Sequence, residues 1–77
     1  MNAKRRKVLE EIKSGLESAL VTLATCKEEE QEAFDNMTEN LQQTERGQKM
    51  EAAVDALDDA YSNLETVIES LETAVEN

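Results

Sequence analysis

Residues 50–77 read MEAAVDALDDAYSNLETVIESLETAVEN, and the spacing of their apolar side chains predicts a long α-helix. Apolar residues recur there at alternating steps of three and four: Met50, Ala53, Leu57, Ala60, Leu64, Val67, Leu71 and Ala74. A further one follows every seven positions: Val54, Tyr61, Ile68 and Val75. The stripe is wider than the ~100° that a surface helix buries against one neighbour, so we expect it to face more than one helix.

The same stretch carries eight acidic residues and neither lysine nor arginine. Seven of the eight form a row at helical spacings, the acidic row, which is interrupted only by Ser62: Glu51, Asp55, Asp58, Glu65, Glu69, Glu72 and Glu76. Like charges at these spacings each cost a helix about 0.2–0.5 kcal/mol. Because these unfavourable spacings persist along the whole helix, we expect the acidic row to have a function. The candidate partner-binding residues are therefore Glu51, Asp55, Asp58, Glu65, Glu69 and Glu72.

A second helical pattern lies upstream. Its apolar residues also step by three and four, with Val8 and Leu20 widening the stripe: Leu9, Ile12, Leu16, Ala19, Leu23 and Cys26. We predict one domain over 1–77, with helices at about 3–33 and 45–75 and a connector at about 34–44. The short connector predicts an antiparallel, coiled-coil-like hairpin of the all-α class.

The connector carries its own signals. Thr38 is expected to cap one helical turn at Glu39–Gln42, and Thr44 to cap the second long helix. Gly47 is expected to allow close packing against the connector. The apolar residues predicted to close this end of the core are Phe34, Met37 and Leu41.

A two-helix hairpin has one internal seam, and chains this small seldom build a sufficient core from one seam. We therefore expect two hairpins to form a homodimeric four-helix bundle, or else a partner protein to supply the missing surface. The predicted assembly interface is Leu57, Leu64, Ile68 and Leu71. The antiparallel arrangement also predicts that the basic cluster at residues 4–7 pairs with Glu69, Glu72 and Glu76.

The composition narrows the classes of partner. Eighteen acidic and eight basic residues give a net charge of −10. This charge repels nucleic acid and anionic membranes, so we expect neither as a direct partner and favour a protein with a basic surface. No apolar run approaches the ~18 residues of a membrane span, and the basic start lacks the apolar core of a signal peptide. The expected location is the cytoplasm.

Few residues suit catalysis or metal binding. Histidine is absent and Cys26 is the only cysteine, which excludes a Cys–His nucleophile and leaves too few ligands for zinc. At a core position of the first helix, Cys26 is predicted to pack as a small apolar side chain. Glycine-rich phosphate-binding loops are absent too. We therefore expect no enzyme activity, no cofactor and no metal.

Residues 28–57, EEEQEAFDNMTENLQQTERGQKMEAAVDAL, combine an acidic run, Phe-Asp-Asn at 34–36, a short polar turn, Glu-Arg-Gly at 45–47 and an amphipathic acidic helix. In this combination the chain resembles a group of small acidic helical proteins encoded by phages, prophages and conjugative elements of gut Firmicutes. The resemblance implies a mobile-element origin and a bacterial host cell. It implies no particular biochemistry and carries over no functional residue.

Three functions remain open. The first is non-enzymatic protein binding through helix faces, in a phage or mobile element. The second is an acidic inhibitor that imitates nucleic acid, by class-level analogy with anti-CRISPR and other phage inhibitors of host-defence nucleases. Eighteen acids along a hairpin of ~45 Å give about one charge per 2.5 Å, against one per ~1.7 Å in duplex DNA. The third is a purely structural bundle component, in which the acidic row only maintains solubility.

Overall fold

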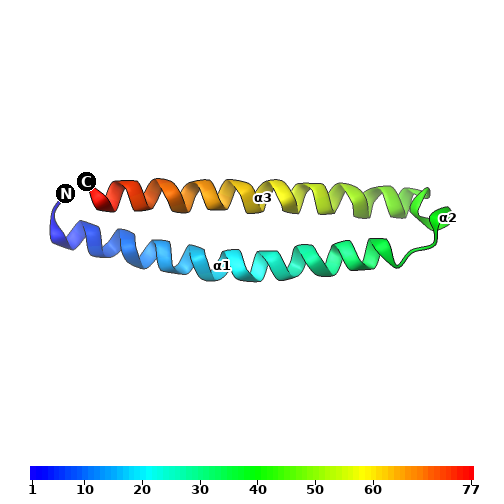
Figure 1. Ribbon diagram of the computed structural model, residues 1–77, viewed down its shortest axis with the longest axis horizontal. Coiled ribbons are helices and arrows are strands. Elements are labelled where there is room, and N and C mark those ends of the chain that lie inside the picture. Colours follow the sequence, from blue (N-terminus) through cyan, green and yellow to red (C-terminus); the bar gives the residue numbers. More distant parts are fainter.

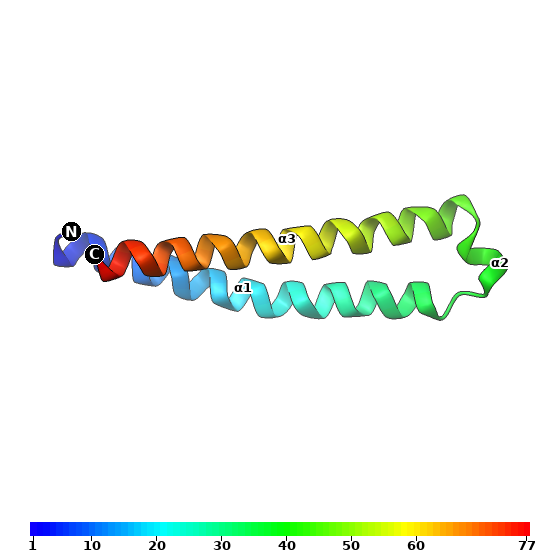
Figure 2. The ribbon, with the colours of Figure 1, turned by 45° about the horizontal axis from the view of Figure 1, so that its top comes forward.

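The computed structural model describes all of residues 1–77 and contains helices only (Figure 1). Helix α1 spans Ala3–Asp35, α2 spans Glu39–Gln42 and α3 spans Glu45–Glu76. Helices α1 and α3 run antiparallel and side by side, with α2 at one end of the molecule and both termini at the other (Figure 1, Figure 2). The rod measures 58 × 14 × 13 Å. The predicted all-α hairpin is confirmed, and its two long helices end slightly later than predicted.

Each helix begins at a capping side chain. Asn2 accepts a hydrogen bond from the backbone N–H of Arg5 at 2.7 Å, and Thr44 accepts one from Gly47 at 3.3 Å. Such caps satisfy N–H groups that have no partner within the first helical turn. Thr38 caps α2 in the same way. Both predicted threonine caps are therefore confirmed.

One side chain ties the connector to the end of α1. Nε2 of Gln42 donates hydrogen bonds to the carbonyl oxygens of Phe34 and Met37, at 3.0 and 3.3 Å. The backbone of Gln42 also approaches Gly47 so closely that a Cβ there would lie 2.6 Å from the Gln42 Cα, which confirms the predicted close packing. Phe34 and Met37 are half-buried as expected. Leu41 is exposed instead, because Gln42 is the residue of α2 that turns toward α1.

The apolar core is a single seam between α1 and α3. Ile68 is its only fully buried apolar side chain, at 7% exposure. The other apolar seam residues are half-buried: Leu9, Leu16, Leu20, Leu23 and Phe34 on α1, and Met50, Val54, Leu57, Tyr61, Leu64, Leu71 and Val75 on α3. Lys13 and Lys27 occupy seam positions as well. Their alkyl stems cover apolar surface while their ammonium groups reach acids of α3.

The seam uses only part of each predicted stripe. Ile12, Ala19 and Cys26 of α1 are exposed, as are Ala60 and Val67 of α3. Two helices in contact bury only the strip of each that faces the other, and the predicted stripes were wide enough to contain a second strip. The prediction that Cys26 is buried in the core is therefore wrong.

Candidate interaction faces

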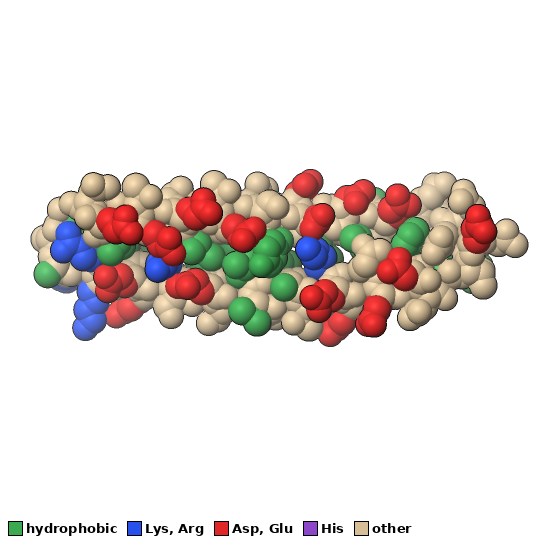
Figure 3. Space-filling view, viewed as in Figure 1, with side chains coloured by type: hydrophobic (Ala, Val, Ile, Leu, Met, Phe, Trp, Pro, Cys, Tyr) green, Lys and Arg blue, Asp and Glu red, His purple; other side chains and the backbone are tan.

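The acidic row lies along one long side of the hairpin, with all of its residues exposed. Acids of α1 line the same side, since Glu10 shares one hollow with Glu72 and Glu76. Figure 3 shows an apolar strip that runs between two lines of acidic side chains. We call this side the acidic face and define it as the acidic row together with Glu10 and Glu17.

Two lysines of α1 bridge the seam to the acidic row. Nζ of Lys27 lies 2.8 Å from Oδ1 of Asp58, and Nζ of Lys13 lies 3.3 Å from Oε1 of Glu72. The Lys27 ammonium also lies over the ring of Tyr61, 5.1 Å from its centroid, within cation–π range. Exposed ion pairs of this kind contribute little to stability. Their effect is to neutralise two acids of the row.

The pKa of the Lys27 ammonium is raised above its ordinary value of 10.5, chiefly because Asp58 accepts its hydrogen bond. Desolvation opposes this rise in pKa, and the electrostatic effects of Asp58, Tyr61 and Glu28 add to it. Lys27 therefore stays a fixed positive charge on the acidic side near neutral pH.

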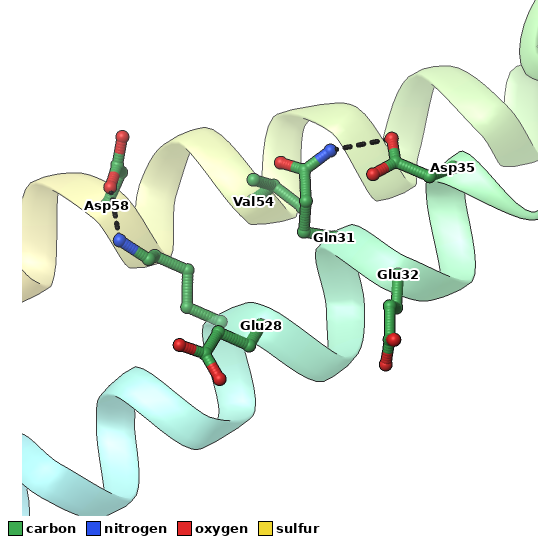
Figure 4. Close-up of a pocket in the computed structure, with 7 residues that line it drawn as sticks. Glu28, Gln31, Glu32, Asp35, Val54 and Asp58 are labelled. Carbon is green, nitrogen blue, oxygen red and sulfur yellow. Dashed lines mark hydrogen bonds and ion pairs between the residues drawn. The ribbon is translucent and has the colours of Figure 1, made fainter.

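The hollow beside Lys27 does not resemble a small-molecule site. Figure 4 shows the amine bonded to Asp58, Gln31 bonded to Asp35 at 2.9 Å, and Glu28 turned away from α3. Val54 is the single apolar residue in the lining. Ligand pockets are lined mostly by apolar side chains with a few well-placed polar groups, so the mostly polar lining of this hollow does not favour a small-molecule ligand.

The six predicted partner-binding residues divide by their pairing. Asp58 and Glu72 are held in ion pairs with lysines. The other four are exposed and have no cationic partner: Glu51, Asp55, Glu65 and Glu69. The structure keeps all six on one side, and their role in partner binding stays a prediction.

The predicted pairing of the basic cluster is not found. No side chain of residues 4–7 forms an ion pair, and Nε of Arg6 donates instead to the carbonyl oxygen of Val75 at 2.9 Å. In the alignment of the two helices, Lys13 pairs with Glu72 and Arg6 lies beside Val75, so the cluster lies beyond Glu69 and Glu72. Glu76 follows Val75 in the chain, but it forms no ion pair with the cluster.

The opposite side of the hairpin has no charged side chain over most of its length. We call it the neutral face; it consists of Val8, Ile12, Gly15, Ala19, Thr22 and Cys26 on α1, and Ala53, Ala56, Ala60, Asn63, Val67, Ser70 and Ala74 on α3. Only Ala53 and Ala74 among these are half-buried, and the rest are exposed. Val8, Ile12 and Val67 leave 48%, 48% and 46% of their surfaces exposed.

The two rows of the neutral face lie on the same side of the hairpin. The ion pairs of Lys13 and Lys27 show that the acidic flanks of both helices lie together, so the opposite flanks lie together on the other side. At the connector end, Ala33 and Arg46 continue the two rows at the seven-residue spacing, and both line one hollow.

The four predicted assembly residues divide between the two sides. Ile68 is buried in the seam beside the acidic row. Leu57, Leu64 and Leu71 are half-buried, and each lies four residues after one member of the neutral face and three before the next. The three leucines therefore border the neutral face, and their part in assembly stays a prediction.

The neutral face was not predicted as a separate surface, because its residues belong to the same wide stripe as the seam. A signal that separates the two is present in the sequence. Lys13 and Lys27 share a seven-residue spacing with Leu20 and Phe34, which marks the seam row. No charged residue falls within the rows of the neutral face.

No cluster of three or more His, Cys, Asp or Glu side chains is placed to hold a metal ion. None of the helices has a stretch long and apolar enough to cross a membrane. No family model, curated protein or solved structure matches this chain. The acidic face and the neutral face are therefore the features that bear on function.

Proposed function

We propose that this chain is a non-enzymatic protein-binding module of a phage or other mobile element, and that it binds through its neutral face. One observation carries the proposal: the seam fully buries a single apolar side chain, Ile68, while Val8, Ile12 and Val67 stay about half exposed. One seam in a chain of 77 residues is a small core. A helical surface docked on the neutral face supplies the missing burial.

Site-specific photo-cross-linking tests this proposal. A benzoylphenylalanine residue replaces Ala60 on the neutral face, Glu65 on the acidic face or Thr66 on the outer side of α3, in the full chain expressed in a bacterial host. We expect covalent protein adducts at Ala60 and none at Thr66. Adducts at Glu65 alone assign the binding to the acidic face, and the absence of adducts at both positions overturns the proposal.

A second candidate function is an acidic inhibitor that competes with nucleic acid for a basic groove. The exposed acids of the acidic face that have no cationic partner favour it, among them Glu51, Asp55, Glu65 and Glu69. The length of the hairpin weighs against close imitation: over 58 Å, eighteen acids give about one charge per 3 Å and the net charge about one per 6 Å, against one per ~1.7 Å in DNA. The expected 2.5 Å per charge was too short, because the rod is 58 Å long and not ~45 Å.

The second candidate has its own test. Heparin, a polyanion, is expected to compete away an adduct formed at Glu65, because both occupy the same basic groove. Neutralising three further acids of the row that have no cationic partner is expected to abolish that adduct: Glu51→Gln, Asp55→Asn and Glu69→Gln. The matched control makes the same change in net charge elsewhere: Glu11→Gln, Glu29→Gln and Glu32→Gln. Equal binding by both variants contradicts this function.

A further inference from the structure

The neutral face is set apart by its charge, in a molecule of net charge −10. The row of neutral-face residues on α1 lies between Arg5 and Glu29, and the row on α3 begins after Lys49. Between these charges, each row continues for about 30 Å at ~1.5 Å per residue. A surface that contacts this strip finds no charged group to pair with, so an uncharged surface fits it best.

We infer that a second copy of this chain covers the neutral face, so that two hairpins form a four-helix bundle. The inference rests on the proposed function, because it names the protein that the face binds. In a two-fold dimer the same patch of both copies meets, so a patch that complements itself is sufficient.

Charge is the first argument for a second copy. Two molecules of net charge −10 repel each other, and contact through their acidic faces brings carboxylates together. On the neutral face, two copies meet without any carboxylate at the centre, and both acidic faces then point outward into water. A basic partner finds its complement on the acidic face and has no charge to pair with on the neutral one.

Area is the second argument. The two rows of the neutral face lie side by side between the levels of the Arg6–Val75 and Lys27–Asp58 contacts, over about 25 Å at ~1.5 Å per residue. Two helices, each ~10 Å across, present there a strip about 20 Å wide, on the order of 500 Å² per copy. Stable complexes bury about 600–1,000 Å² on each partner. The neutral face comes close to the lower end of this range, and the bordering leucines Leu57, Leu64 and Leu71 add to it.

Packing is the third argument. The alanines and Gly15 of the neutral face allow helices to approach to the 8–10 Å that is usual for packed pairs. A Cβ at Gly15 has no atom within 4 Å in the isolated hairpin. Leu57, Leu64 and Leu71 border this face and are only half-buried by the seam. They supply the larger side chains of a core shared by the two copies.

Sedimentation equilibrium of the full chain, at about 1–500 μM and with circular dichroism on the same samples, tests the inference. We expect a helical species of twice the 8.6 kDa chain mass. The double variant Ala60→Glu and Val67→Glu places carboxylates within the interface, and we expect it to raise the dissociation constant at least about 100-fold. The control Thr66→Glu and Thr73→Glu adds the same charge on the outer side of α3 and is expected to stay dimeric.

The reactivity of Cys26 tests the inference without a disruptive variant. Its thiol is exposed in the single hairpin and lies within the face that dimerisation covers. We expect its modification by a thiol reagent to slow at least about tenfold between dilute and concentrated protein. Moving the thiol by one residue, with Thr25→Cys and Cys26→Ser, places it outside the interface. The rate for this variant is expected not to depend on concentration.

The outcomes separate this inference from the proposed function. A helical monomer at every concentration overturns the inference that a second copy covers the neutral face. In that case, adducts at Ala60 with a different protein still support the proposed binding through the neutral face. A dimer that ignores Ala60→Glu with Val67→Glu, or that leaves Cys26 fully reactive, meets through another surface and overturns the inference too.

Discussion

The two long sides of this hairpin come from the same pair of helices, yet their side chains have different surroundings in the single chain. On the acidic face, Lys13 and Lys27 form ion pairs with two carboxylates of the acidic row, and all acids of the row are exposed. On the neutral face, apolar side chains such as Ile12 and Val67 stay about half exposed. The contrast teaches that a helix whose apolar stripe exceeds one neighbour keeps a second apolar surface exposed, and this is the surface through which we propose that the chain binds.

The largest predicted difference between the two sides is the loss of stability on truncating Ile68 or its neighbour Val67. Ile68 is buried in the seam at 7% exposure, whereas Val67 is 46% exposed on the neutral face. In dilute protein, Ile68→Ala is expected to lower the free energy of unfolding by about 2–5 kcal/mol through the cavity that it leaves. Val67→Ala is expected to lower it by about 0.5 kcal/mol or less, as at other surface positions. Urea denaturation followed by circular dichroism measures both, and equal losses at low concentration contradict the assignment of Val67 to an uncovered face.

Substituting the two glycines with alanine is expected to have the next largest effect on the free energy of unfolding. Gly47→Ala is expected to cost about 1–3 kcal/mol in the free energy of unfolding, because the new Cβ meets the backbone of Gln42. Gly15→Ala on the neutral face meets nothing within 4 Å in the single hairpin, so in dilute protein it is expected to stabilise by up to ~1 kcal/mol. Thermal melts of the two variants make the measurement. Destabilisation by Gly15→Ala under dilute conditions means that the neutral face is already closely covered.

Salt is expected to act through the acidic face. Repulsion along the acidic row costs about 0.2–0.5 kcal/mol per neighbouring pair and is screened by ions. Raising sodium chloride from about 20 to 500 mM is therefore expected to raise the melting temperature by roughly 5 °C. Neutralising four acids of the row that have no cationic partner, Glu51, Asp55, Glu65 and Glu69, is expected to reduce this rise in melting temperature. The reduction is expected to exceed that from neutralising four acids outside the row: Glu11, Glu29, Glu32 and Glu39. A melting temperature that falls with salt means that the ion pairs of Lys13 and Lys27 outweigh the repulsion.

The smallest predicted effect is the pH dependence of the Lys27 ion pair. Because the folded-state pKa of Lys27 is raised above 10.5, its contribution is fully present below about that pH and is lost as the pH rises through the folded-state pKa. Both proteins compared carry Tyr61→Phe, which removes the phenol group beside Lys27. Between pH 10 and 12, the protein with Asp58 is expected to lose more thermal stability than the Asp58→Asn variant. Parallel profiles mean that the ion pair does not stabilise the fold.

Much of the fold follows from local patterns in the sequence. The caps at Thr38 and Thr44 and the turn at Glu39–Gln42 lie where they were predicted, because a cap depends only on a side chain and an N–H three residues away. Gly47 was correctly predicted to pack closely on the connector. The acidic row stays on one side, because helical spacing alone decides which residues share a face.

Other features needed the placement of one helix against the other. Cys26 has the same heptad pattern as a core residue and is nevertheless exposed. The basic cluster at residues 4–7 forms no ion pair with its predicted acids. The alignment of the helices places it beyond Glu69 and Glu72, and Arg6 bonds the backbone of Val75 instead. Leu57, Leu64 and Leu71 separated from Ile68 for the same reason, since a modest rotation of α3 decides which side of the seam each side chain borders.

The sequence by itself determined the helices, their ends, the antiparallel hairpin and the shared side of the acidic row. All of these depend on hydrogen bonds and spacings within a few residues, or on the shortness of the connector. Only the tertiary structure decided which half of the wide apolar stripe became the seam and which half became the neutral face. That choice depends on rotation and register between two helices, which follow from the packing of seam residues far apart in the chain around Ile68. The contacts of Lys13 with Glu72, Lys27 with Asp58 and Arg6 with the backbone of Val75 mark the resulting alignment.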